Sequence, residues 1–242
     1  MNELFPRYRI GRVRQLVDAK AVPVPNGANA TWAFDNENRY WVRKRIVNTG
    51  VESLFAECVG WLFGDTLGLR QPRAALFEAE DGWSWLSERV PNATHWSSEL
   101  RDRIANLDEV GAMLALDAIL LNEDRHAANI LVQPSVGDQV LLWAIDCGNA
   151  LVSYPDDFTD TQRPSVRNHA RGLPVPALRL GALRAAELAS RLERAKLEAF
   201  IDEAVAVAEE PRGHEILELL CERCQSAVAI VNDHLDNLER LF

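Results

Sequence analysis

The middle of the chain pairs a helical repeat of apolar residues with two short strand-like stretches. Apolar positions spaced three and four apart predict a helix over residues 108–121, which ends where a polar segment breaks the period. Residues 129–132 and 139–145 are typical of strands, and the segment between them contains the turn formers Pro, Ser, Gly and Asp. A hairpin of this length returns Asp146, which follows its second strand, to the side of Asn129.

The regions before and after this central segment differ in their predicted secondary structure. Residues 39–46 are rich in aromatic and β-branched residues and predict a strand, and residues 10–17 form a second strand-like stretch. Residues 52–66 have the spacing of an amphipathic helix. Toward the carboxyl end, residues 180–208 and 214–242 each predict one long helix. We therefore expect an α+β chain with a β-rich first part and a helical second part.

Three polar side chains around this predicted hairpin are candidates for a catalytic and metal-binding site. Asp124 lies in the loop before the first strand, Asn129 opens that strand, and Asp146 follows the second one. Phosphoryl transfer to a hydroxyl needs a carboxylate beside the attacking oxygen and oxygen ligands that hold magnesium on the nucleotide phosphates. These three side chains provide both, without any assumption about distant parts of the chain.

The motif order Asp-Arg-His-x-x-Asn, followed by Asp-x-Gly after an apolar strand, resembles the HipA-like kinases and, more distantly, the phosphatidylinositol 3/4-kinases and the protein kinases. The resemblance implies a two-lobe protein-kinase-like fold, with an N-lobe over residues 1–90 and a C-lobe over residues 91–242. It implies that Asp124 orients the substrate hydroxyl or accepts its proton, and that Asn129 and Asp146 hold Mg²⁺. His126 would lie close to the transferring phosphoryl group.

Two upstream residues extend the resemblance. A period of two puts Val42 and Lys44 on one face of their strand, so that Lys44 would bind the ATP phosphates while Val42 covers the adenine. Glu57, in the middle of the helix over residues 52–66, would pair with Lys44. Read alone, Lys44 is equally well explained as one charge in a basic edge strand, and Glu57 as a solvated side chain.

The remaining nucleotide contacts are implied by position. Small and polar residues before the lysine strand could let backbone amides approach phosphate oxygens; the candidates are Asn26, Gly27 and Ala28. The Gly-x-Gly-x-x-Gly spacing is lacking, so an ordinary turn is an equal alternative. HipA-like kinases can autophosphorylate a serine in this loop, but Thr31 is the only hydroxyl here. Glu88 and Val90 mark the expected adenine hinge, which acts through backbone groups.

Composition limits the other possibilities. A net charge of −10 disfavours direct nucleic-acid binding and an anionic membrane surface, and no apolar run is long enough to span a bilayer. The four cysteines have no secreted-type spacing, which favours a reducing cytoplasm. Cys221 and Cys224 form one spaced pair without a second, so buried helix cysteines are favoured over a zinc site. A basic cluster after Asp146 could receive an acidic substrate or be a solvated loop; it comprises Arg163, Arg167, His169 and Arg171.

The preferred hypothesis is a cytoplasmic ATP- and Mg²⁺-dependent kinase that phosphorylates serine or threonine of an unidentified protein and that could belong to a toxin–antitoxin type of system. A lipid or small-molecule kinase is one alternative. A nucleotide-binding pseudokinase that acts as a regulatory partner is another. The first twenty residues offer only one strand-like stretch, so the additional amino-terminal subdomain of HipA proteins, if needed, is expected from a partner chain or antitoxin.

Overall fold

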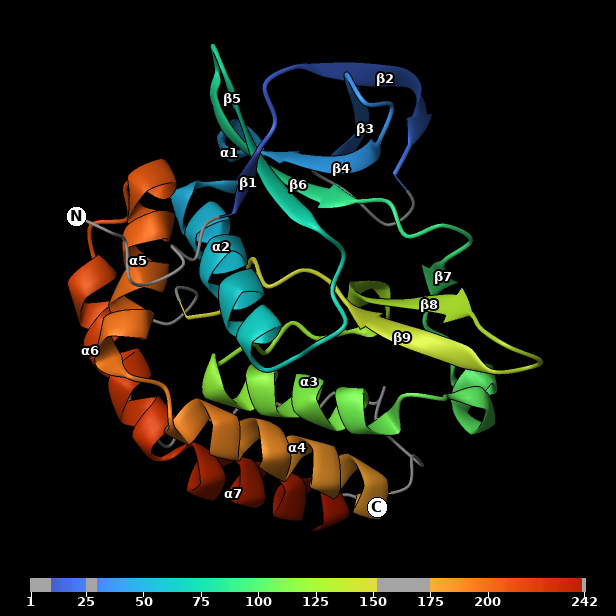
Figure 1. The fold of residues 1–242 in the computed structure, drawn as a ribbon, viewed down its shortest axis with the longest axis vertical. Helices are drawn as coiled ribbons and strands as arrows, with labels where there is room; N and C mark the ends of the chain where they lie inside the picture. Colours follow the sequence, from blue (N-terminus) through green and yellow to red (C-terminus); the bar gives the residue numbers. More distant parts are fainter. Residues whose placement is uncertain (1–9, 25–29, 152–174, 241–242) are drawn as a thin grey trace, which may run out of the picture.

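The computed structural model describes residues 10–24, 30–151 and 175–240. Within them, six strands form one curled sheet in the order β1-β5-β6-β4-β3-β2 (Figure 1). The strands are β1 (Gly11–Arg12), β2 (Leu16–Pro23), β3 (Ala30–Asp35), β4 (Tyr40–Arg45), β5 (Ala74–Ala79) and β6 (Gly82–Glu88). Helices α1 (Ile46–Thr49) and α2 (Val51–Thr66) follow β4 directly.

The rest of the described chain is mainly helical around a smaller sheet. That sheet has the order β7-β8-β9, with β7 (Thr94–His95), β8 (Ile130–Pro134) and β9 (Val140–Ala144). The helices are α3 (Leu107–Ile119), α4 (Val175–Ser190), α5 (Arg194–Ala208), α6 (Gly213–Gln225) and α7 (Ala227–Arg240), with 3₁₀ turns η1 (Ser98–Arg103) and η2 (Ala127–Asn129). The predicted α+β class, β-rich first and helical second, is confirmed.

Three predicted elements were wrong in their extent. The stretch over residues 10–17 contains β1 and the start of β2, and β1 pairs in parallel with β5 whereas β2 pairs antiparallel with β3. The predicted helices 180–208 and 214–242 are each two helices, α4 with α5 and α6 with α7. Because α4 packs on α3 while α5 packs on α2, the chain must turn between them. The apolar repeat continues through that turn, so periodicity alone could not reveal it.

Strand β4 is an interior strand, bonded to β3 on one side and β6 on the other. The edge-strand alternative for Lys44 is therefore wrong. Side chains alternate along β4, with Trp41 and Arg43 buried on one face and Val42 and Lys44 on the other. Arg43 donates to Asp18 and to the hydroxyl of Ser84, so its buried charge is compensated.

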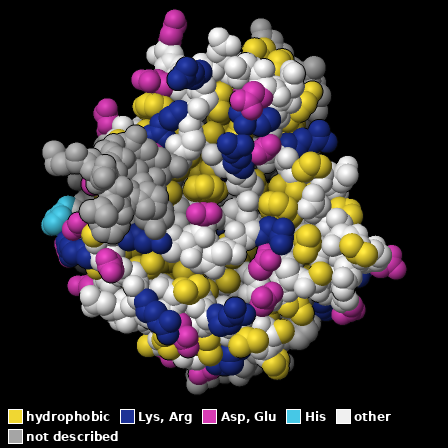
Figure 2. Space-filling view, in the orientation of Figure 1, with side chains coloured by type: hydrophobic (Ala, Val, Ile, Leu, Met, Phe, Trp, Pro, Cys, Tyr) yellow, Lys and Arg dark blue, Asp and Glu magenta, His cyan; other side chains and the backbone are white. Residues whose placement is uncertain are grey.

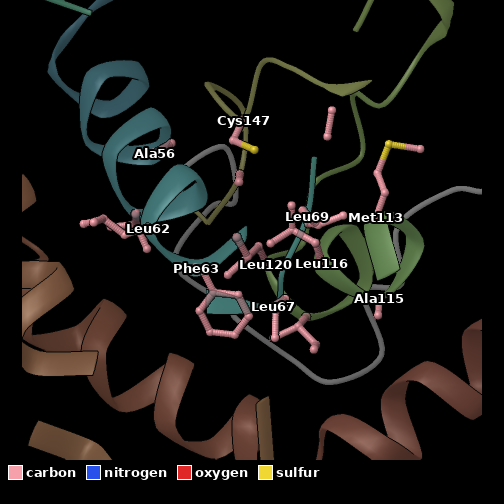
Figure 3. Close-up of a cluster of buried hydrophobic side chains, with 14 of the residues drawn as sticks. Ala56, Leu62, Phe63, Leu67, Leu69, Met113, Ala115, Leu116, Leu120 and Cys147 are labelled. Atoms are coloured by element: carbon pink, nitrogen blue, oxygen red, sulfur yellow. The ribbon is translucent and has the colours of Figure 1, made fainter. Parts of the chain in front are cut away.

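One hydrophobic core joins the two parts of the chain. Helix α2 is buried along much of its length because α5, α3 and β6 all contact it. In Figure 3, Phe63 from α2 and Leu116 from α3 lie in the same cluster, and Cys147 enters from the loop after β9. Full burial of side chains of this size stabilises the fold by about 1.5–3 kcal/mol each. The described helices include none that is apolar over a length sufficient to cross a bilayer.

The four cysteines are free and buried. Cys221 and Cys224 pack in the core from α6, as predicted. In the described part of the chain, no group of three or more His, Cys, Asp and Glu side chains is arranged to hold a metal ion.

Helices α3 and α4 approach each other through two glycines. A Cβ added to Gly111 of α3 would lie 2.0 Å from the carbonyl oxygen of Leu178, and one added to Gly181 of α4 would lie 1.9 Å from that of Asp108. Both obstacles are backbone atoms, which cannot rotate away. The contact requires glycine on each helix.

We expect Gly111→Ala to destabilise the protein by about 1–3 kcal/mol. The free-energy cost of forcing a methyl group into this crossing should exceed the gain of about 1 kcal/mol in helix propensity on replacing glycine. Urea unfolding measures the difference. Gly11→Ala is the control, since its added Cβ would lie 3.6 Å from the nearest atom. A Gly111→Ala protein as stable as Gly11→Ala would contradict the close crossing of α3 and α4.

Candidate nucleotide and metal site

The centre of the site is an ammonium group between two carboxylates. Lys44 Nζ on β4 lies 2.6 Å from Glu57 Oε1 on α2 and 2.7 Å from Asp146 Oδ2 in the loop after β9. The Glu57 side chain is 5% exposed, and those of Lys44 and Asp146 are 21% and 30% exposed. Residues separated by about a hundred positions in the sequence thus meet at one cation.

The electrostatics follow from burial and from this arrangement. Burial disfavours the charged form of Lys44, but attraction to Glu57 and Asp146 outweighs it and raises the pKa of Lys44. For Asp146, burial also opposes the charge, yet Lys44 lowers the pKa on balance. Burial raises the pKa of Glu57 in spite of the opposing attraction of Lys44. Lys44 therefore stays charged and holds two acids that would otherwise repel each other.

Glu57 also ties α2 to the loop that carries Asp146. Its second oxygen, Oε2, accepts a hydrogen bond of 3.0 Å from the backbone N–H of Cys147. The two segments lie so close that a Cβ on Gly60 would be 2.4 Å from Cys147 Cβ. A Cβ on Gly148 would likewise be 2.6 Å from Ser53 Oγ. This close approach explains why the loop has the form Asp-x-Gly.

Asp146 adopts a left-handed backbone conformation, with φ of 64°. Its Oδ1 accepts a hydrogen bond of 3.2 Å from the N–H of Gly148. Asp is among the residues that tolerate this region, because a short polar side chain can bond locally. The conformation turns the side chain out of the β9 line and toward Lys44.

A second buried cation, Arg125, organises the loop with Asp124. Its guanidinium pairs with Asp117 of α3 at 2.9 Å and donates to the backbone carbonyls of Asn129 and Ile145. Burial opposes its charge, but Asp117 raises the pKa of Arg125 on balance. Arg125 is 3% exposed, so this part of the loop is anchored in the interior of the protein.

The groups around Asp124 are bonded to one another. Asn129 Nδ2 donates to the backbone carbonyl of Asp124 at 2.8 Å, which directs the amide oxygen of Asn129 away from that carbonyl. His126 Nε2 lies 3.9 Å from Asp124 Oδ2, and His126 Nδ1 accepts from the N–H of Ala128. The N–H of Ile145 bonds to the carbonyl of Asn129 at 3.3 Å, so the residue before Asp146 lies directly beside Asn129.

The predicted nucleotide contacts are placed as follows. Val42 pairs with Ser87 of β6 on one side and with Trp32 of β3 on the other. Glu88 pairs with Trp41, and the N–H of Arg89 bonds to the carbonyl of Tyr40, so the hinge segment continues β6 along β4. Val90 follows with a buried side chain. Two sets lie outside the described residues: Asn26, Gly27 and Ala28, and the basic cluster Arg163, Arg167, His169 and Arg171.

Sequence reasoning missed three participants. Trp32 lies directly opposite Val42, on the sheet face that also presents Lys44. Asp117 binds Arg125, and a lone acid within an apolar helix was the available signal. Asn149 donates from Nδ2 to Asp124 Oδ2 at 2.7 Å. No spacing rule indicated this last contact, because it depends on the turn after Gly148.

The donor set at Asp146 and Asn129 fits magnesium. A carboxylate and an amide oxygen are hard ligands of the kind Mg²⁺ prefers, and a bound nucleotide would add phosphate oxygens. The two residues come from the ends of β9 and β8 that the hairpin brings together. Their role as metal ligands stays a prediction from the motif.

Comparisons with known proteins bear on the fold. No family model and no curated protein sequence matches the chain. Among solved structures, the chain is similar to the proinflammatory kinase CtkA of Helicobacter pylori, with a TM-score of 0.61 and 16% identity, covering 94% of this chain and 99% of that one. It is also similar to HipA in a toxin–antitoxin complex of HipA, HipB and operator DNA from Shewanella oneidensis, with a TM-score of 0.49 and 12% identity, covering 86% of this chain and 65% of that one.

The first of these comparisons identifies a kinase fold. The two-lobe kinase-like fold that the motifs implied is thereby confirmed. At 16% identity, the likeness gives the arrangement of the chain and not its substrate.

We expect Lys44→Met to destabilise the protein by on the order of 3–5 kcal/mol near pH 8, because it leaves Glu57 buried without its cation. The ordinary pKa of a glutamate is 4.5, and burial without Lys44 raises the folded-state pKa further above it. Between pH 4.5 and the raised pKa of Glu57 in the folded state, the folded protein binds more protons than the unfolded protein. The stability of the variant therefore falls as the pH rises through that range. Urea unfolding at pH 5.5 and pH 8 should show the larger loss at pH 8.

The double variant Lys44→Met with Glu57→Gln is the control. Removing the acid should recover stability at pH 8 and abolish the extra pH dependence. A Lys44→Met protein with equal losses at both pH values would contradict the buried pairing.

Proposed function

We propose that this chain is an ATP-dependent phosphotransferase that moves the γ-phosphoryl group to a hydroxyl, with serine or threonine of a protein as the acceptor. The observation that supports it most directly is the position of Lys44 between Glu57 and Asp146 in a chain with a kinase fold. Asp124 and Asn129 occupy the adjoining loop, so each group that the reaction requires is present nearby.

Each residue has one task in this proposal. Lys44, held by Glu57, binds the phosphates of the nucleotide. Asp146 and Asn129 hold magnesium, which when bound neutralises charge on the phosphate oxygens. Lys44 now contacts Asp146 directly, so nucleotide binding would move that ammonium toward phosphate and leave the Asp146 carboxylate to the metal.

Asp124 acts on the acceptor. Its carboxylate orients the hydroxyl and takes its proton while the hydroxyl oxygen bonds to the γ-phosphorus. The bond between that phosphorus and the bridging oxygen breaks, so the products are the phosphorylated acceptor, ADP and one proton. The Asp124 side chain is 34% exposed, which leaves it accessible to an acceptor. His126 lies on the same side and would contact the transferring group.

The nucleobase would lie against the sheet face shared by Val42 and Trp32. Because these residues are directly paired on β4 and β3, their side chains leave the sheet on the same face as Lys44. Arg89 of the hinge lies over the Trp32 ring, 6.0 Å from its centroid. An indole beside the phosphate-binding lysine provides a flat surface for a purine ring.

A protein acceptor is favoured over a lipid. The net charge of −10 opposes attraction to an anionic membrane, and Figure 2 shows acidic and basic side chains interspersed on this face. The four buried, free thiols agree with a reducing cytoplasm. We also propose that this chain acts together with a partner chain or antitoxin. A non-catalytic nucleotide-binding module would not need Asp124, and this residue separates the two readings.

Labelled ATP tests the proposal. With Mg²⁺ and a total cell extract, the protein should transfer label to itself or to an added protein, and Asp124→Ala and Asp146→Ala should each abolish transfer. Asp138→Ala is the matched control, because Asp138 lies exposed in the turn between β8 and β9. Label on lipid rather than protein would favour a lipid kinase. Thermal stabilisation by ATP without any transfer would favour the binding module.

Trp32→Ala should weaken ATP binding about fivefold or more, since loss of base–aromatic stacking costs about 1–3 kcal/mol. Calorimetric titration measures the Kd for Mg²⁺–ATP. Trp32→Phe should retain most of the affinity because it keeps an aromatic face, and binding of Mg²⁺–tripolyphosphate should not change. Equal affinity of Trp32→Ala and the parent protein for ATP would place the base elsewhere.

A further inference from the structure

The turn after Gly148 brings one side chain to the group that would act on the acceptor. Asn149 Nδ2 donates to Asp124 Oδ2 at 2.7 Å. The donor belongs to the loop of Asp146, and the acceptor belongs to the loop between α3 and β8. A hydrogen bond from a neutral amide to a carboxylate is stronger than one between two neutral groups, because the acceptor is charged.

The backbone holds Asn149 in place from both sides. Within the turn, the N–H of Ala150 bonds to the carbonyl of Cys147 at 2.9 Å. The N–H of Leu151 bonds at 2.9 Å to the carbonyl of Leu120, which lies just ahead of the Asp124 loop. Ala150 and Leu151 are fully buried, so the turn cannot shift without opening the core.

The Asp124 side of the contact is equally well supported. The N–H of Asp124 bonds to the side-chain oxygen of Asn122, and its carbonyl accepts from Asn129. Asn122 is in turn held by Asp117 at 2.8 Å. Both ends of the bond are therefore attached to a rigid frame, and the bond between them sets the rotation of the carboxyl group.

We propose that Asn149 is a positioning residue for Asp124. Its N–H occupies Oδ2, and His126 Nε2 also lies on the Oδ2 side. This bond fixes the orientation of the carboxylate that meets the acceptor hydroxyl and takes its proton. The inference rests on the proposed phosphotransferase function. It adds that the Asp146 loop, which would hold the metal, also orients Asp124 through Asn149.

Steady-state transfer from labelled ATP tests the proposal through a comparison of Asn149→Ala and Asn149→Asp. Asn149→Ala should lower kcat about tenfold or more, because a bond to a charged group is lost, and change the KM for ATP by less than about twofold. Asn149→Asp keeps the shape but places a second negative charge beside Asp124, so it should be slower than Asn149→Ala.

A purely structural role predicts the opposite order, because the isosteric Asp variant would disturb packing least. Asn36→Asp is the control for charge, since Asn36 lies exposed in the turn between β3 and β4. It should keep the kcat of the parent protein. An Asn149→Asp variant at least as fast as Asn149→Ala would overturn the proposal.

A spectroscopic measurement separates failure of this inference from failure of the proposed function. In a ¹⁵N–¹H spectrum, the side-chain amide signal of Asn149, identified by its loss in Asn149→Asp, should move in Asp124→Ala and stay in place in Asp138→Ala. This measurement requires no phosphate transfer. A signal unaffected by Asp124→Ala would show that the bond is absent and would overturn the proposal whatever the enzymatic result.

Discussion

The attraction between Lys44 and its two carboxylates holds the site together. Glu57 belongs to a helix that packs against the first sheet, whereas Asp146 belongs to the loop after the second sheet. The two acids would repel each other at this separation without the ammonium between them. The same contact therefore sets the position of α2 against β4 and the position of the Asp146 loop against α2. A nucleotide that bound Lys44 through its phosphates would act on all three elements.

A second buried cation, Arg125, also holds segments together by charge, on the other side of the Asp146 loop. Arg125 joins Asp117 on α3 to the carbonyls of Asn129 and Ile145, which are the ends of β8 and β9. Between the two cations lies Cys147, whose N–H bonds to Glu57 and whose sulfur accepts a weak hydrogen bond from Arg125. Burial raises the pKa of the Cys147 thiol to about 12, so it remains neutral and acts as a packing group. The Asp146 loop is thus fixed by charge on both faces and by apolar contact at its centre.

This division explains how the two acids of the motif come to differ. Asp146 is paired with the cation Lys44, which lowers its pKa, whereas Asp124 is held by the neutral donor Asn149. In the proposed reaction, the acid that orients the acceptor has to be reached by it, and the acid that holds the metal has to be fixed against the phosphates. The hairpin of β8 and β9 would meet both requirements, because its two ends lie side by side.

Much of this arrangement follows from local patterns in the chain. The period of two along β4 separates Lys44 from Arg43, and the length of the hairpin returns Asp146 to Asn129, since both features depend only on strand geometry. The order of the motifs likewise indicated a kinase fold. Short-range geometry could not supply the break between α4 and α5, because apolar spacing continues across a turn that only packing on α3 and α2 requires. Nor could it reveal that Arg125 is buried, that Trp32 faces Val42, or that Asn149 reaches Asp124, because each contact joins segments whose relative position is set by the folded core.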